Sequence, residues 1–168
     1  MRPSLKLWLV TWFGLGFLLI GASLLFKTHR SSVSPQTASP PQSLPKPSVT
    51  INNRTLSVEP ADTPEKQRQG LAGHEPLTET QGMLFPYDPP QQVTFWMKNM
   101  TFPIDIIYIA DDQVSQIFAD VPPPESGTTD NDLTRYPSKQ PIDYVLETRA
   151  GWTRDHHIAV ADPVTFDW

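Results

Sequence analysis

An uncharged apolar run of 20 residues, which begins at Leu7 and ends at Phe26, limits what the first part of this chain can fold into. A helix of that length spans about 30 Å, which is the thickness of the hydrocarbon core of a bilayer. Such a helix has no polar face to turn toward water at the surface of a globular protein. The sequence therefore predicts a transmembrane anchor over residues 1–26, with its apolar core at residues 7–26, and the membrane as a partner.

The alternative is a cleaved signal peptide, which has an apolar core of about 7–15 residues and then a small-x-small cleavage site. Here the apolar core is longer, and Ile20 is bulky at the first small position of Ile20-Gly21-Ala22. We therefore expect an uncleaved single span, with secretion after cleavage as the alternative. A short head before the span and a large domain after it favour a cytoplasmic N-terminus and a periplasmic or extracytoplasmic C-terminal domain.

Residues 27–48 have the composition of a spacer. They contain five prolines and six serines and no aromatic residue. A segment of this kind buries too little apolar surface to offset the entropy lost on ordering. We predict a disordered linker that places the following domain at a distance from the membrane.

The charges divide at the same place. Residues 1–48 contain five basic side chains and no acidic one, whereas residues 49–168 contain 8 basic and 18 acidic side chains. The acidic domain lacks the basic stripe of a nucleic-acid-binding protein, so we expect no nucleic acid as a partner.

The 168 residues include no cysteine, which excludes disulfides and thiolate metal sites, and no standard cofactor motif is present. We expect no metal or cofactor.

Residues 49–168 predict a mostly β fold. Short apolar runs alternate with turn signals such as Asn52-Asn53 and Asp111-Asp112-Gln113, and 13 prolines fit a loop-rich β domain better than a helical one. The expected architecture is a compact antiparallel β-sandwich or barrel. One short helix is expected to begin after Thr63, with Pro64 in its first turn, and to end near Gly70.

A series of short motifs occurs in order along this domain. They are Gly70-Leu71, Gly82-Met83-Leu84-Phe85, Phe95-Trp96-Met97-Lys98-Asn99, Pro103-x-Asp105, Leu146-Glu147, Ala150-Gly151 and Asp162. Over about residues 50–167 this set resembles the uncharacterised bacterial family called domain of unknown function 192. The resemblance implies a compact, mostly β domain, often exported or membrane-tethered, without a defined reaction. The chain departs from the family pattern at Ala72, His74 and Ala161, where methionine, arginine and glycine respectively are common.

The strand-like segment from Val93 to Asn99 carries a candidate ligand site. The two-residue period of a strand places Phe95 and Met97 on one face and Trp96 and Lys98 on the other. On that second face, Lys98 is suited to an anionic group of a ligand. Asn99 either contacts the ligand or caps the turn that follows.

Two acidic residues lie in otherwise apolar predicted strands. Asp105 opens one such strand and Glu147 closes another. An unpaired buried charge is very costly, so these carboxyl groups must be paired or lie near the surface. The functional interpretation is a polar ligand-binding site of Trp96, Lys98, Asn99, Asp105 and Glu147. The structural interpretation is a buried ion-pair network, or separate charges at strand ends.

The aromatic residues allow the same two interpretations. Phe85, Tyr87, Phe95, Trp96 and Trp152 are suited either to a ligand groove or to the core of a small β domain.

No standard catalytic motif is present, so we favour a non-enzymatic role. The expected function is a membrane-tethered extracytoplasmic binding or accessory domain, whose partner is a small polar ligand or a membrane protein. One alternative is an enzyme for a small substrate, with Lys98, Asp105 and Glu147 as catalytic residues. The other alternative is a structural subunit of a membrane complex.

Overall fold

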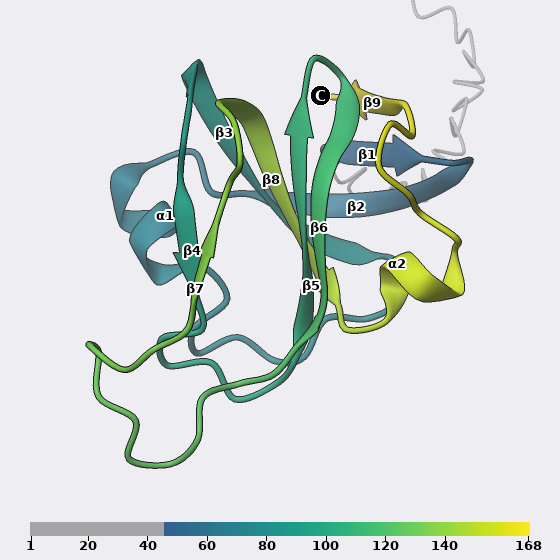
Figure 1. The fold of residues 1–168 in the computed structure, drawn as a ribbon. Coiled ribbons are helices and arrows are strands. Elements are labelled where there is room, and N and C mark those ends of the chain that lie inside the picture. The colour runs from purple at the N-terminus through teal and green to yellow at the C-terminus, as the bar shows by residue number, and fades with distance from the viewer. Residues whose placement is uncertain (1–45) are drawn as a thin grey trace, which may run out of the picture. The chain divides into compact units, whose positions relative to one another are not determined.

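A computed structural model describes residues 46–168 of the chain, which form a curled, mostly β domain with two short helices (Figure 1). A seven-stranded sheet has the strand order β6-β5-β8-β3-β2-β1-β9, and β4 and β7 form a separate two-stranded sheet. The elements are β1 (Ser48–Ile51), β2 (Arg54–Pro60), α1 (Pro64–Gln69), β3 (Gln81–Gln91), β4 (Thr94–Trp96), β5 (Ile104–Ala110), β6 (Gln113–Val121), β7 (Arg135–Pro137), β8 (Ile142–Arg149), α2 (Trp152–Asp155) and β9 (Val164–Asp167).

The predicted transmembrane anchor lies outside the described residues, as does nearly all of the predicted linker. Within residues 46–168, none of the helices has the length and apolar character needed to cross a bilayer.

The mostly β prediction is confirmed, but the structure differs from the expected antiparallel sandwich or barrel with one helix in three respects. The large sheet is a curled half-barrel, in which the outermost strands β6 and β9 meet only at one end, through an antiparallel bridge between Gln113 and Pro163. The sheet is mixed, because β2 and β3 pair in parallel. Parallel neighbours need a crossover connection, and here the segment containing α1 provides it. A second helix, α2, follows β8.

The two hairpins expected from turn residues are present. Asn52 and Asn53 have φ values of 49° and 61° between β1 and β2, and Asp111 and Asp112 have values of 51° and 55° between β5 and β6. Two successive residues at positive φ give the turn that matches the twist of paired strands, and asparagine and aspartate tolerate this conformation better than most residues.

The α1 helix begins and ends as its sequence indicates. The Thr63 hydroxyl accepts a hydrogen bond from the Lys66 amide at 3.2 Å, and Pro64 occupies the first helical position. Gly70 follows the helix with a φ of 52°. The Gln67 side chain donates a hydrogen bond to the Pro86 carbonyl at 3.0 Å, which holds α1 beside β3.

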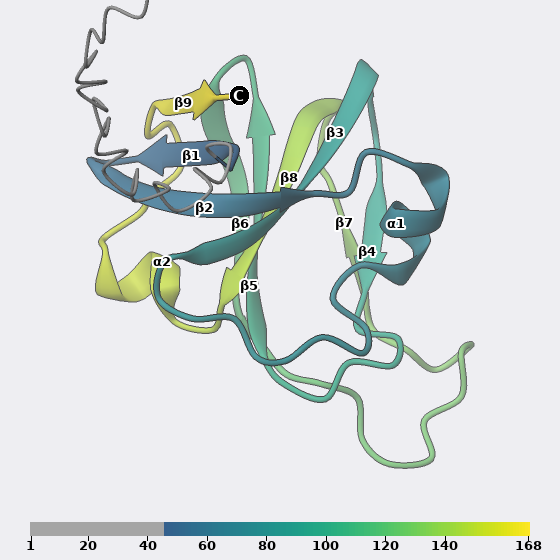
Figure 2. The same cartoon turned by 180° about the vertical axis from the view of Figure 1, so that it is seen from behind.

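The core lies on both faces of the large sheet, so that all seven residues of β5 are buried. Ile106 and Tyr108 belong to a first apolar cluster, which also includes Met97 and has Phe95 packed against it, and which β4 and β7 cover. Ile107 and Ile109 belong to a second cluster on the opposite face, which β1, β9 and α2 cover. The opposed views in Figures 1 and 2 show α1, β4 and β7 on one side and α2, β1 and β9 on the other.

Candidate functional site

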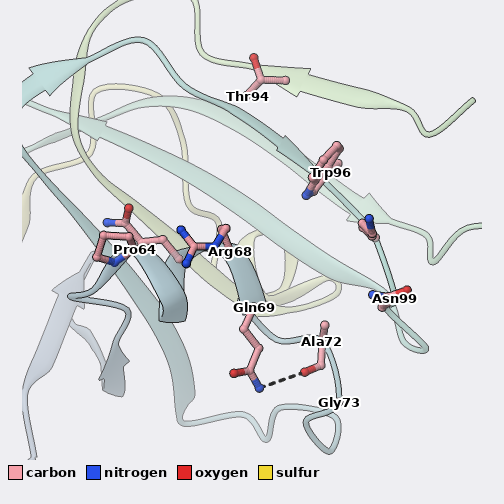
Figure 3. Close-up of a pocket in the computed structure, with 10 residues that line it drawn as sticks. Pro64, Arg68, Gln69, Ala72, Gly73, Thr94, Trp96 and Asn99 are labelled. Carbon is pink, nitrogen blue, oxygen red and sulfur yellow. Dashed lines mark hydrogen bonds between the residues drawn. The ribbon is translucent and has the colours of Figure 1, made fainter. Parts of the chain in front are cut away.

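A surface groove of about 830 Å³ runs between α1 and β4. Figure 3 shows Pro64 and Arg68 on the α1 wall, with Thr94 and Trp96 on the β4 wall. Ala72 and Gly73, which follow α1, complete one end. A groove of this size is within the range of small-molecule binding sites in proteins.

A smaller pocket of about 120 Å³ shares Arg68, Trp96 and Lys98 with the groove and extends toward the core. Its inner lining includes Phe85, which is 1% exposed, and Glu147, which is 5% exposed. Aromatic side chains supply much of the wall, namely Phe85, Tyr87, Phe95 and Trp96. The groove and the pocket therefore lead from an exposed, positively charged rim to a buried carboxyl group.

The position of Glu147 follows from the two-residue period of β8. Leu146 belongs to the second core cluster, whereas Val145 belongs to the first, so Glu147 points to the same face as Val145. Its neighbours across the sheet are Met83 on β3 and Ile106 on β5, neither of which offers a polar side chain. Glu147 is thus held by two apolar strands at the inner wall of the pocket.

No described residue pairs with the carboxyl group of Glu147 at its Oε2 atom. This oxygen atom is enclosed. Burial raises the pKa of Glu147 to about 8, because the charged form loses its hydration and gains nothing in return. At neutral pH the side chain is therefore mainly a protonated acid.

Two tyrosines lie close enough to Glu147 to feel its charge. Burial raises the pKa of Tyr87 to about 12, with a further contribution from Glu147. Burial also raises the pKa of Tyr108, with smaller contributions from Tyr87 and Glu147. Both phenols remain protonated at neutral pH and provide no positive charge that would balance Glu147.

The rim of the pocket carries an exposed aromatic ring, Trp96, with two cations close to it. Trp96 is 41% exposed, and its ring centroid lies 4.1 Å from the Arg135 guanidinium carbon and 5.7 Å from the Lys98 ammonium nitrogen. Lys98 also forms a salt bridge with Asp130. Cations at these distances from an indole face are attracted to the ring, so Trp96 and the two cations form one surface unit.

Arg68 on the opposite wall pairs with Glu65 at 2.9 Å, and the two side chains are 68% and 75% exposed. Exposed ion pairs of this kind contribute little to stability, because water screens the charges. The guanidinium can therefore exchange its partner for a ligand at little cost.

Asn99 follows β4 in the left-handed conformation, with a φ of 59°, and lines the outer groove. The Met100 amide donates to the Met97 carbonyl at 3.1 Å, which closes the turn around Lys98 and Asn99. This turn places Lys98 at the rim while Met97 is buried in the core.

Asp105 lies elsewhere. Its carboxylate accepts hydrogen bonds from the amides of Asp120 at 2.8 Å, Gly151 at 2.9 Å and Thr153 at 2.8 Å, and from the Thr153 hydroxyl at 2.6 Å. These bonds tie the loop before α2 to the end of β6. Asp105 is fully enclosed and fully partnered, which is the arrangement of a structural carboxylate.

The register of β5 and β8 explains why the two acids separate. Ile106 pairs with Glu147, and Asp105 pairs with Thr148. Directly paired residues share a face, and successive residues alternate, so Asp105 and Glu147 point to opposite faces of the sheet. The structure brings Trp96, Lys98 and Glu147 to one pocket and does not bring Lys98, Asp105 and Glu147 together.

Of the aromatic residues considered for a groove, Phe85, Tyr87, Phe95 and Trp96 line the pocket, whereas Trp152 belongs to the second core cluster. Arg68 was not predicted as a site residue, because the sequence around it shows only helix-capping signals and no pattern that identifies the wall of a groove. Within residues 46–168, no group of three His, Cys, Asp or Glu side chains is arranged to hold a metal ion.

The solved structures similar to this chain include two with a TM-score of 0.63. One is a protein of unknown function from Novosphingobium aromaticivorans, which is 32% identical over 72% of this chain and 84% of its own. The other is a Sinorhizobium meliloti protein provisionally described as a transcription regulator, which is 27% identical over 74% of this chain and 97% of its own. Comparison with curated proteins gives no match.

The family model DUF192, described as "Uncharacterized ACR", matches residues 47–166, which is nearly all of the described domain. Its range contains both the pocket with Glu147 and the network around Asp105. The chain therefore belongs to the DUF192 family.

Proposed function

We propose that the domain is a binding module for a small polar ligand, which enters the groove between α1 and β4 and reaches Glu147. One observation carries the proposal: a buried carboxyl group, whose Oε2 atom has no partner within residues 46–168, lines an aromatic pocket that opens to the surface. Buried carboxyl groups that serve the fold are normally hydrogen-bonded, as Asp105 is. A ligand that donates to Glu147 supplies the missing partner.

The enzyme alternative has less support. Acid–base catalysis by Lys98, Asp105 and Glu147 needs all three groups at one substrate. Asp105 faces the other side of the sheet, and its oxygens are occupied by four hydrogen bonds. Binding requires only the groups that line the pocket.

We further propose that the module works at a membrane. The support is the uncharged run of residues 7–26, which is long enough to span a bilayer, and the proline- and serine-rich composition of residues 27–48. The acidic domain would then face the periplasm or an equivalent compartment. The mature chain is expected to begin near residue 1 and to leave the membrane fraction only with detergent. A mature N-terminus beyond about residue 22, found by mass spectrometry, would contradict the anchor.

The binding proposal is tested by thermal unfolding of the full chain in detergent micelles, against a panel of small amines, carboxylates, phosphates, sugars and amino acids. At least one class is expected to raise the unfolding temperature by several degrees, as ligands of the folded state do. The Trp96→Ala variant should lose that response. The matched control is Trp168→Ala, since Trp168 is also exposed and does not line the pocket.

The proposal fails if no class stabilises the wild-type chain, or if Trp96→Ala responds as the wild type does.

A further inference from the structure

Positive side chains lie at the rim of the pocket, and an acidic side chain lies at its inner end. Arg68 from α1 and Lys98 from the turn after β4 line both the outer groove and the inner pocket. Glu147, which is 5% exposed, lines the inner pocket but not the outer groove. A ligand that enters from the groove therefore meets two cations first and a buried carboxyl group last.

This order selects among ligand classes. The rim carries three cations, Arg68, Lys98 and Arg135, against two carboxylates that pair with the first two, Glu65 and Asp130, so its net charge is positive. A simple cation suits Glu147 but is repelled by this net charge, and a simple anion suits the rim but gains nothing from a buried carboxyl group. A molecule with an ammonium group at one end and an anionic group at the other satisfies both ends. The charge pattern therefore favours a zwitterion.

The aromatic wall supports the same orientation. Phe85, Tyr87 and Phe95 line the pocket with Glu147, and aromatic rings attract ammonium groups, most strongly where water is excluded. The pocket volume of about 120 Å³ fits a small ammonium-bearing end, and the outer groove of about 830 Å³ leaves space for the rest of the molecule.

From this arrangement we propose that the pocket binds a small zwitterion, whose ammonium group reaches Glu147 while its carboxylate or phosphate group stays at the rim beside Arg68 and Lys98. The inference rests on the proposed binding function and names the class of ligand for the same site.

Binding of an ammonium group requires Glu147 to lose its proton. Burial raises the pKa of this carboxyl to about 8, so the acid is mainly protonated at pH 7. The ionisable groups that face it are Tyr87 from β3, Tyr108 from β5, Arg68 and Lys98. Both tyrosines have raised pKa values, so neither titrates between pH 6 and 8. At pH 7, uptake of the zwitterion should release close to one proton from the protein.

The experiment is isothermal titration calorimetry on the full chain in detergent micelles, in two buffers of different ionisation enthalpy. The probes are 4-aminobutanoate and phosphoethanolamine, with butylamine and butanoate as matched single-charge compounds. The two zwitterions are expected to bind at least tenfold more tightly than either single-charge compound. Affinity should rise close to tenfold between pH 6 and pH 7, and proton release should make the observed heat depend on the buffer. The carboxylate and phosphate probes distinguish the two kinds of anionic group.

Two substitutions locate the two ends. Glu147→Gln should weaken zwitterion binding at least tenfold and abolish both the proton release and the pH dependence. Arg68→Gln should weaken zwitterion binding several-fold and strengthen butylamine binding, because a repulsive charge is removed. The matched control is Lys66→Gln on the same helix, since Lys66 lines neither the groove nor the inner pocket and should change neither affinity.

Three results would overturn the inference: butylamine or butanoate binding as tightly as the zwitterions, zwitterion binding that survives Glu147→Gln unchanged, or binding of no probe at all. The proposed binding function is tested separately, by the thermal unfolding panel. It is retained if another class in the thermal panel binds in a Trp96-dependent way, and lost if no class does.

Discussion

The substitution Glu147→Gln is expected to change how the stability of the domain depends on pH. Glutamine keeps the length of the side chain and removes its charge. In the wild-type protein the pKa of Glu147 is raised by burial to about 8, whereas the ordinary value of a glutamate is 4.5. Between these two values the folded state keeps the proton and the unfolded state loses it. The free energy of unfolding therefore falls as the pH rises through this window.

The size of the effect follows from the two pKa values. Each pH unit within the window removes up to about 1.4 kcal/mol, so the loss between pH 5 and pH 7 is about 2–3 kcal/mol. The Gln variant has no such loss at this position. Its free energy of unfolding relative to the wild type should therefore increase by about 2–3 kcal/mol over the same two pH units.

Urea unfolding of the full chain in non-ionic detergent measures this difference, with pulse proteolysis to count the folded fraction at pH 5, 6 and 7. The contributions of other groups, such as the Glu79 and Asp155 carboxyls whose pKa values are lowered mainly by hydrogen bonds from Arg149, cancel when the variants are compared. The exposed Glu125→Gln substitution is the matched control and should run parallel to the wild type. Parallel curves for Glu147→Gln and the wild type would refute a buried, unpaired Glu147.

Three further substitutions test the fold by urea unfolding. Asp105→Ala leaves three backbone amides without their acceptor and should lower the free energy of unfolding by about 3 kcal/mol or more. Asp105→Asn should be intermediate, because asparagine retains one acceptor oxygen. Equal stability of the two variants would contradict the network. Ala161→Gly should stabilise the domain by about 1 kcal/mol, because Ala161 has a φ of 74°, and a destabilised variant would show that this backbone is not strained. Thr63→Ala should cost about 1 kcal/mol through loss of the α1 cap, whereas an unchanged midpoint would show that the cap contributes nothing.

The parts of the fold that the sequence predicts are those determined by neighbouring residues. Asn52-Asn53 identifies its hairpin because the turn conformation depends on those two residues alone. Thr63 and Pro64 identify α1 for the same reason. By contrast, α2 begins after Gly151 without a side-chain cap, so no local signal marks its start.

The direction in which β2 and β3 pair is a non-local property. Ser57 pairs with Gln81 and Pro60 with Leu84, yet neither strand carries a residue that distinguishes parallel from antiparallel pairing. The outcome depends on the path of the chain through α1 and the loop that follows. Local turn signals, which favour hairpins, therefore led to an all-antiparallel expectation.

The site divides in the same way. Trp96 and Lys98 lie two residues apart along a single short segment, so their nearness follows from the sequence. Glu147 reaches the same pocket from β8, through pairing that no local pattern specifies. A shift of one residue in the register of β8 would have exchanged the faces of Leu146 and Glu147. The separation of Glu147 from Asp105 is thus a property of register, which the sequence alone does not give.

The two buried acids of this sheet differ in whether their carboxyl groups are hydrogen-bonded. Both lie in apolar strands, yet Asp105 accepts four hydrogen bonds, which offset the cost of burying its charge and hold the loop before α2. Glu147 lowers the stability of the domain by about 3 kcal/mol at pH 7 relative to a group that does not ionise, a large share of the 5–15 kcal/mol that keeps a domain folded. A glutamine or an apolar residue at this position would relieve that cost within the fold. The unpaired carboxyl is therefore better explained by a partner that comes from outside the chain, and the pocket in front of it is where such a partner would enter.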